Sequence, residues 1–204
     1  VDAVIEIPEP TGRDVLVAVR AISVNPVDTK VRAPKEKTET EPRVLGWDAA
    51  GEVVATGADV QHYAVGDRVF YAGDITRSGS NSEYQLVDER IVGRAPATLD
   101  FAQAAALPLT SITAWEALFD RLGISRAGKD AGKTILIIGG AGGVGSIAIQ
   151  LASRIAQLTV IATASRPESG DWVKKLGAGH VVNHRHALDV ELRSIGVPTV
   201  DYIL

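Results

Sequence analysis

The sequence predicts two architectures in one chain, a β-rich segment over residues 1–108 and an α/β segment with a parallel sheet over residues 109–204. The first segment has short β-branched runs separated by Pro, Gly and Asp, and no long helical period, which is typical of an all-β arrangement. From residue 134 onward, β-branched runs alternate with helical stretches, which is typical of right-handed βαβ units. The boundary falls near Pro108 to Ser111.

The β-rich segment contains six runs with turn residues between them. The expected strands are residues 4–7, 15–24, 51–56, 68–71, 82–86 and 91–94. The polar stretch 29–42 is expected to be an exposed loop. Two helices are expected next, 101–107 with Asp100 as its N-cap, and 111–122 ending at Gly123, with Trp115 in the core.

The α/β segment alternates four expected strands with three expected helices. The expected strands are residues 134–138, 159–163, 180–183 and 200–204, and the expected helices are 144–156, 168–176 and 188–194. Strands followed by helices in this order form a parallel sheet with right-handed crossovers.

A glycine-rich turn joins the first strand and first helix of this segment. Residues 134–146 read Thr-Ile-Leu-Ile-Ile-Gly-Gly-Ala-Gly-Gly-Val-Gly-Ser, a strand, a tight turn and the start of a helix. This arrangement lays a dinucleotide pyrophosphate on a helix N-terminus. Gly140 is expected to permit the turn, Gly142 to let phosphates approach the main chain, and Gly145 to let helix and strand pack closely. Gly143 and Val144 complete the expected phosphate cradle.

Composition excludes several classes of function. A net charge of −4, with 46% hydrophobic and 23% charged residues, gives no reason to expect nucleic acid or an anionic membrane as the main partner. No apolar run approaches the roughly 20 residues that span a bilayer, and no secretory signal opens the chain. The expected location is therefore the cytoplasm. A start at Val1 and a stop at Leu204, within an expected strand, indicate a chain truncated at both ends.

The chain has no cysteine. Disulfides, thiolate metal ligands and a cysteine nucleophile are thereby excluded from it. His184 and His186 stand two apart, but no carboxylate-and-histidine set at metal-binding spacing accompanies them, and a solvated loop pair is favoured. No metal site is expected.

The end of the second α/β strand determines the choice of cofactor. An acid there would bond the ribose 2′-hydroxyl of NAD, whereas a small residue beside an arginine accommodates the 2′-phosphate of NADP. The chain has Ser165 and Arg166 and no acid until Glu168. A serine can donate to the phosphate and an arginine can pair with it, so NADP(H) is favoured over an ordinary surface role for Arg166.

Phrases along the whole chain resemble one family. They are Ser-Val-Asn-Pro-Val-Asp-Thr from residue 23, Val-Leu-Gly-Trp-Asp-Ala-Ala-Gly from 44, Val-Gly-Asp-Arg-Val from 65, Leu-Pro-Leu-Thr-Ser-Ile-Thr-Ala-Trp from 107, the glycine turn, and Lys-Leu-Gly-Ala from 175. The chain resembles the zinc-independent medium-chain dehydrogenases/reductases, which include quinone oxidoreductases and zinc-type alcohol dehydrogenase-like proteins. The resemblance implies a GroES-like β-rich catalytic domain followed by part of a Rossmann domain, with the full-length protein a homodimer.

Zinc enzymes of the same superfamily have a cysteine at the position of Asn25, a histidine at Trp47 and a second cysteine near Leu109. An amide, an indole and an alkyl chain do not replace those zinc ligands. The resemblance and the ligand chemistry together predict a zinc-free protein.

The resemblance also implies residues around the nicotinamide and substrate. They are Asn25, Asp28, Trp47, Asp48, Tyr71 and Thr113, and His184 falls near the adenosine phosphate. Asn25 is the best candidate donor to a substrate carbonyl or to the nicotinamide ribose. Tyr71 is a candidate proton donor or, equally, an interior aromatic. Asp48 has a structural alternative as an acceptor of main-chain N–H groups near the glycine turn at Gly46, and His184 has one as an ordinary loop residue.

These observations predict an NADPH-dependent, metal-free oxidoreductase that transfers hydride to a quinone or an α,β-unsaturated carbonyl compound. Metal-free alcohol/aldehyde interconversion is one alternative, disfavoured because an alcohol needs a strong base or a Lewis acid to lose its proton. A non-catalytic NADPH-binding protein, in the manner of lens crystallins, is the other.

Overall fold

The computed structural model describes residues 4–33 and 43–204. The chain divides into two compact units, Val1–Leu109 and Thr110–Leu204. Each unit contains its own sheet and its own apolar core. The expected order of a β-rich part followed by a parallel α/β part is confirmed.

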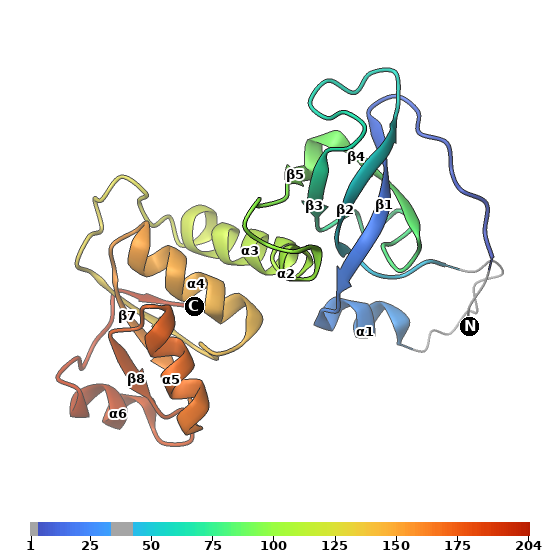
Figure 1. Cartoon of the computed structure of the whole chain (residues 1–204). Coiled ribbons are helices and arrows are strands. Elements are labelled where there is room, and N and C mark those ends of the chain that lie inside the picture. The colour runs from blue at the N-terminus through green and yellow to red at the C-terminus, as the bar shows by residue number, and fades with distance from the viewer. Residues whose placement is uncertain (1–3, 34–42) are drawn as a thin grey trace. The chain divides into compact units, whose positions relative to one another are not determined.

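The first unit is built on a five-stranded antiparallel sheet in the order β4-β1-β2-β3-β5 (Figure 1). Its strands are β1 (Asp14–Ser23), β2 (Asp48–Thr56), β3 (Arg68–Tyr71), β4 (Tyr84–Asp88) and β5 (Val92–Arg94). Alternate residues of these strands point to one side, as the period of two requires. They form a core of Val15, Val17, Ala49, Val53, Val69, Tyr71 and Val87. Helix α2 (Phe101–Ala105) packs against this sheet and is capped by Asp100, whose side chain accepts from the Gln103 N–H, as expected.

Two expectations for this unit are wrong. Residues 4–7 belong to no strand, and Val4, Ile5 and Ile7 are exposed, because β-branched residues form a strand only where a neighbouring strand pairs with them. Residues 29–32, expected in a loop, lie in helix α1 (Pro26–Arg32). The rest of that expected loop, residues 34–42, lies outside the described residues.

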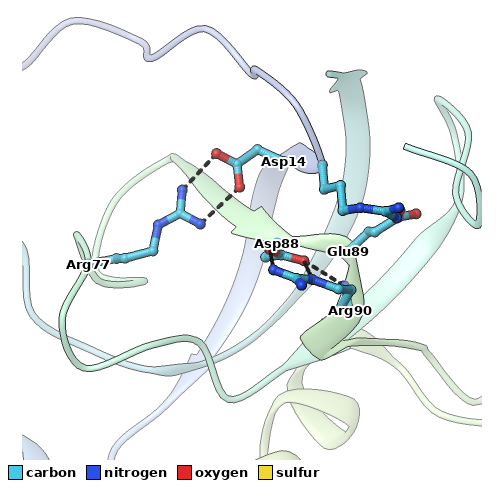
Figure 2. Close-up of polar contacts among 6 residues, drawn as sticks. Asp14, Arg77, Asp88, Glu89 and Arg90 are labelled. Carbon is cyan, nitrogen blue, oxygen red and sulfur yellow. Dashed lines mark hydrogen bonds and ion pairs between the residues drawn. The ribbon is translucent and has the colours of Figure 1, made fainter. Parts of the chain in front are cut away.

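Buried and half-buried carboxylates tie the turns of the first unit to its strands (Figure 2). Glu89, in a short 3-10 helix (Glu89–Ile91), accepts from Arg13 Nη1 at 2.8 Å and from the main-chain N–H groups of Gln61 and His62 at 2.9 Å each. These donors lower the pKa of the Glu89 carboxyl against the opposing effect of burial. Arg77 makes a two-pronged pair with Asp14 at 2.9 and 2.8 Å.

The second unit has a four-stranded parallel sheet in the order β8-β7-β6-β9. Its strands are β6 (Thr134–Ile137), β7 (Thr159–Thr163), β8 (His180–Val182) and β9 (Tyr202–Ile203). Its helices are α4 (Gly143–Arg154), α5 (Pro167–Leu176) and α6 (Leu188–Ser194), preceded by α3 (Pro108–Trp115) and a π-helical turn (Glu116–Arg121). The strand order reverses at β6, since β7 and β8 follow on one side of it and β9 on the other.

Both faces of this sheet are covered, as a doubly wound fold requires. One core contains Ile135, Ile137 and Val160 of the sheet with Ile149 of α4 and Val173 of α5. The other contains Leu136, Ile161 and Val182 with Leu192 of α6. Figure 1 shows α5 and α6 beside β8. Trp115, expected in the core, is instead 37% exposed and packs edge-to-face on Phe119 at 4.7 Å between ring centroids.

Candidate nucleotide-binding and substrate-binding residues

The glycine turn connects β6 to α4 and is the first part of the candidate nucleotide-binding site of the second unit. Gly139 has a φ of +67°, a conformation that favours glycine, and the Gly142 N–H donates to its carbonyl at 2.9 Å. The sharp turn therefore depends on Gly139, and the expectation that Gly140 permits it is corrected. Gly140 instead packs on the next strand, because a Cβ there would lie 2.8 Å from the Cβ of Ala162.

Helix α4 begins directly after this turn. Its N-cap is Gly142, which offers no side chain to cap it, and the Ser146 N–H donates to the Gly142 carbonyl at 2.8 Å. The N–H groups of Gly143, Val144 and Gly145 belong to the first turn, where an α-helix has no internal acceptors. A helix end of this kind binds anions. A Cβ on Gly145 would lie 2.6 Å from the Gly139 carbonyl, so only glycine lets this helix start so close to the turn.

The end of β7 carries the residues expected at the ribose. Ser165 is half-buried, and Arg166 is exposed at the N-cap of α5, where its Nη2 donates to the Ser169 Oγ at 3.4 Å. His184 is exposed in the turn after β8. Because β6, β7 and β8 run parallel, the glycine turn, Arg166 and His184 all follow carboxyl ends at one edge of the sheet. Open α/β sheets bind their ligands at this edge, at the point where strand order reverses.

The remaining two cofactor candidates are Thr113 and Trp47. Thr113 is exposed on α3. Trp47, in the first unit, is 4% exposed, and its buried Nε1 has no hydrogen-bond partner among the described residues. An unpaired buried donor of this kind costs free energy of folding.

Asn25 and Asp48 form the polar centre of the first unit. Asn25 caps α1, and its Nδ2 donates to Asp48 Oδ2 at 2.7 Å. The Asp28 carboxylate accepts from the Asn25 main-chain N–H at 2.7 Å and fixes the start of the helix. The other oxygen of Asp48 accepts from the Leu109 N–H at 2.8 Å. Burial raises the pKa of Asp48, and these two hydrogen bonds partly offset that rise.

This geometry bears on the alternatives for Asp48 and Tyr71. Both oxygens of Asp48 accept from groups of its own unit, which favours the structural role, with Leu109 rather than the Gly46 turn as the donor. Tyr71 is 2% exposed within the sheet core, and its hydroxyl has no partner among the described residues. Burial raises the pKa of the Tyr71 phenol.

The described surface has two hollows that the sequence did not point to. One of about 510 Å³ runs along α3 and the π-helical turn, lined by Ser111, Ile112, Trp115, Glu116, Asp120 and Arg121. The other, of about 580 Å³, lies in the first unit between residues 4–8 and residues 81–84. Neither is lined by a residue that the sequence placed in the site.

The donor set does not suit zinc. Asn25 directs an amide N–H toward Asp48, Trp47 has no lone pair to offer, and Leu109 is aliphatic. Within residues 4–33 and 43–204, no three His, Asp or Glu side chains gather as a metal-binding group. His186 bonds Glu191 through Nδ1 at 2.8 Å instead. The same described part of the chain contains no helix long and apolar enough to cross a membrane.

Comparison with known proteins identifies the family. Residues 11–100 match the alcohol dehydrogenase GroES-like domain, and residues 143–204 match the zinc-binding dehydrogenase family. The chain is 52% identical over 197 residues to a zinc-type alcohol dehydrogenase-like protein of Staphylococcus aureus (strain Mu50), covering 96% of this chain and 58% of that protein. It is 39% identical to the chloroplastic NADPH-dependent alkenal/one oxidoreductase of Arabidopsis thaliana, covering 88% and 47%.

Solved structures of similar proteins support the same family. A crystal structure of an alcohol dehydrogenase superfamily protein from Novosphingobium aromaticivorans superposes with a TM-score of 0.87 at 35% identity, covering 98% of this chain and 60% of that one. The Escherichia coli quinone oxidoreductase complexed with NADPH superposes with a TM-score of 0.81 at 29% identity, covering 96% and 58%.

A GroES-like unit followed by part of a Rossmann-like parallel sheet is the architecture of the medium-chain dehydrogenases/reductases. The chain belongs to the medium-chain dehydrogenase/reductase family, with zinc-type alcohol dehydrogenase-like proteins and quinone oxidoreductases among its relatives. It spans 58% of the length of the Staphylococcus aureus relative.

Proposed function

We propose that the whole protein is an NADPH-dependent, metal-free oxidoreductase that reduces a quinone or an α,β-unsaturated carbonyl compound. The observation that carries this proposal is the glycine turn, which joins β6 to an uncapped helix at the reversal point of a parallel sheet. Relatives named as quinone and alkenal/one oxidoreductases support the substrate class.

The preference for NADPH over NADH rests on the end of β7. Arg166 leaves its guanidinium exposed beside the N-terminus of α5, and no acid stands between Thr163 and Pro167 to repel a phosphate dianion. Ser165 and the Arg166 fork suit the 2′-phosphate. Gly143, Val144 and Gly145 would hold the pyrophosphate through main-chain N–H groups. Gly142, whose own N–H is bonded to the Gly139 carbonyl, would let the phosphates approach the main chain.

Replacing Arg166 with Ala tests this assignment. A lost hydrogen bond to a charged group costs about 1.5–3 kcal/mol, so NADPH should bind about 10- to 150-fold more weakly while NADH binding changes little. Arg154→Ala, at the far end of α4 from the glycine turn, is the matched control and should alter neither affinity. Equal losses for NADPH and NADH in the Arg166 variant would refute a 2′-phosphate role.

When bound, the nicotinamide supplies the hydride. The chain's own residues then position the substrate and exclude water. Asn25 uses one Nδ2 hydrogen to bond Asp48, and the second is available to a substrate carbonyl or the nicotinamide ribose. Asp28 holds the main chain of Asn25, and Trp47 and Thr113 are proposed to lie against the nicotinamide.

Two proton sources are open to the reduced product, solvent and the Tyr71 phenol. The burial of Tyr71 and the rise in its pKa favour solvent. No step is assigned to a metal, because an amide committed to Asp48, an indole and an alkyl group make no zinc site.

The direct test is NADPH consumption by the natural polypeptide with a panel of quinones, enones and saturated aldehydes. Turnover of quinones or enones without added metal supports the proposal. Turnover of saturated aldehydes and alcohols alone would favour metal-free alcohol/aldehyde interconversion, and NADPH binding without turnover would favour a crystallin-like binding protein. A cytoplasmic location, a homodimer and the lack of nucleic-acid binding stay predictions.

A further inference from the structure

Thr163, the last residue of β7, contacts the glycine turn twice. Its Oγ1 accepts from the Gly139 N–H at 2.8 Å, and its main-chain carbonyl accepts from the Gly140 N–H at 3.2 Å. The Thr163 side chain is almost wholly buried, at 1% exposure for the residue. A buried hydroxyl that accepts from a main-chain N–H removes a donor that would otherwise be unpaired.

Two hydrogen bonds to Thr163 hold the main chain of the glycine turn against β7 at Gly139 and Gly140. Ala162 of the same strand lies so near that a Cβ on Gly140 would stand 2.8 Å from its Cβ. The Gly139 main chain, with its positive φ, is the part of the turn that the Thr163 hydroxyl holds.

The same strand end leads directly to the ribose side of the candidate site. Ala164 follows Thr163, and its N–H donates to the Val182 carbonyl at 3.0 Å, which anchors the strand end on β8. Ser165 and Arg166 come next. The glycine turn is therefore hydrogen-bonded to Thr163, and the proposed 2′-phosphate residues, Ser165 and Arg166, follow the same buried residue by two and three positions.

We propose that Thr163 is a positioning residue that sets the spacing between the glycine turn and the Ser165–Arg166 segment. A ligand that carries both a pyrophosphate and a 2′-phosphate then meets both sets of donors at once. This inference rests on the proposed binding of NADPH, and it concerns how affinity is divided between the two ends of the cofactor's adenosine half.

The test compares two substitutions at Thr163 with a matched control. Thr163→Val keeps the shape and removes the acceptor, whereas Thr163→Ser keeps the hydroxyl. Thr134→Val is the control, because the Thr134 hydroxyl bonds Asp201 at the opposite edge of the same sheet, at the start of β6. By titration calorimetry, T163V should bind NADPH about tenfold more weakly, and T163S and T134V should stay within about threefold of wild type.

A double-mutant cycle separates positioning from a general structural role. If Thr163 aligns the two ends, Arg166→Ala should cost much less NADPH affinity in the T163V background than in wild type. Losses that add would overturn the proposal, and so would a T163V variant that binds NADPH as wild type does. ADP-ribose, which lacks the 2′-phosphate, should show no coupling between the two positions.

Hydrogen exchange gives a measurement that needs no variant. In the wild-type chain, the Gly139 amide should exchange slowly, and the Gly143 amide, in the first turn of α4, should exchange fast. Equal, fast exchange at both would overturn the proposal even if T163V fails to fold. Wild-type protein that binds no NADPH would defeat the proposed function together with this inference, whereas NADPH binding that is indifferent to Thr163 would defeat the inference alone.

Discussion

Gly145→Ala is expected to weaken NADPH binding by about 30-fold. The new Cβ would lie 2.6 Å from the Gly139 carbonyl oxygen and 2.8 Å from both the Cα and the carbonyl oxygen of Gly140. All three are main-chain atoms, so the turn itself must move. Overpacking of this kind costs up to about 3 kcal/mol, and alanine in a helix returns about 1 kcal/mol over glycine. About 2 kcal/mol remains, and it opposes the return of the turn to the conformation that binds phosphates. This free energy corresponds to an NADPH affinity about 30-fold lower.

Gly170→Ala is the matched control for this substitution. Gly170 lies within α5, and its nearest neighbour to a new Cβ would be Val181 Cγ1 at 3.9 Å, an ordinary contact. The control should gain about 1 kcal/mol of unfolding free energy and keep wild-type NADPH affinity. Titration calorimetry and urea unfolding measure both quantities. A folded G145A variant with wild-type affinity would refute the reasoning that the close approach of Gly145 builds the phosphate cradle.

Three further predictions concern the first unit. Glu89→Gln should lower the midpoint of urea unfolding, because a buried acceptor of three hydrogen bonds is weakened. Glu52→Gln is the control and should leave the midpoint nearly unchanged, since Glu52 belongs to an exposed ion pair; equal effects of the two variants would contradict the structural role of Glu89. Tyr71→Phe should change the unfolding free energy little and keep NADPH turnover, and a large loss of turnover would restore Tyr71 as proton donor. Hydrogen bonds from Arg90 lower the pKa of Asp88 from 3.8 to about 2, so the native state binds fewer protons than the unfolded state between these pH values. The stabilisation that this difference gives the folded state is present above pH 3.8 and is lost as the pH falls toward 2. Asp88→Asn should therefore flatten the fall in the urea midpoint over that range.

Local patterns predicted most of the secondary structure. The strands at residues 68–71 and 159–163 and the helix at 188–194 have the expected bounds, because alternation or helical spacing is a property of neighbouring residues. Helix α1 was missed although Pro26 at its first position and Asp28 at its third are helix-start signals. Seven residues are too few for a hydrophobic period to show.

The candidate site was predicted in part for the same reason. The glycine spacing and Ser165–Arg166 are contiguous and readable in one dimension. The assignment of the sharp turn to Gly140 was wrong, because a motif records which residues are glycine and not which of them has a positive φ. Thr163 had no local signal, since its role depends on a contact with Gly139, which lies 24 residues earlier in the sequence.

The sequence by itself determined the two architectures, the dinucleotide-type turn, the lack of thiolate ligands and the residues that favour a 2′-phosphate. These follow from residue type and from spacing along the chain. Only the tertiary structure decided that Asp48 accepts a hydrogen bond from Asn25, that Tyr71 is enclosed in the sheet core, and that Thr163 accepts hydrogen bonds from the glycine turn. Each of these depends on a contact between distant segments, and hydrogen bonding and burial are settled by where the folded chain brings those segments together.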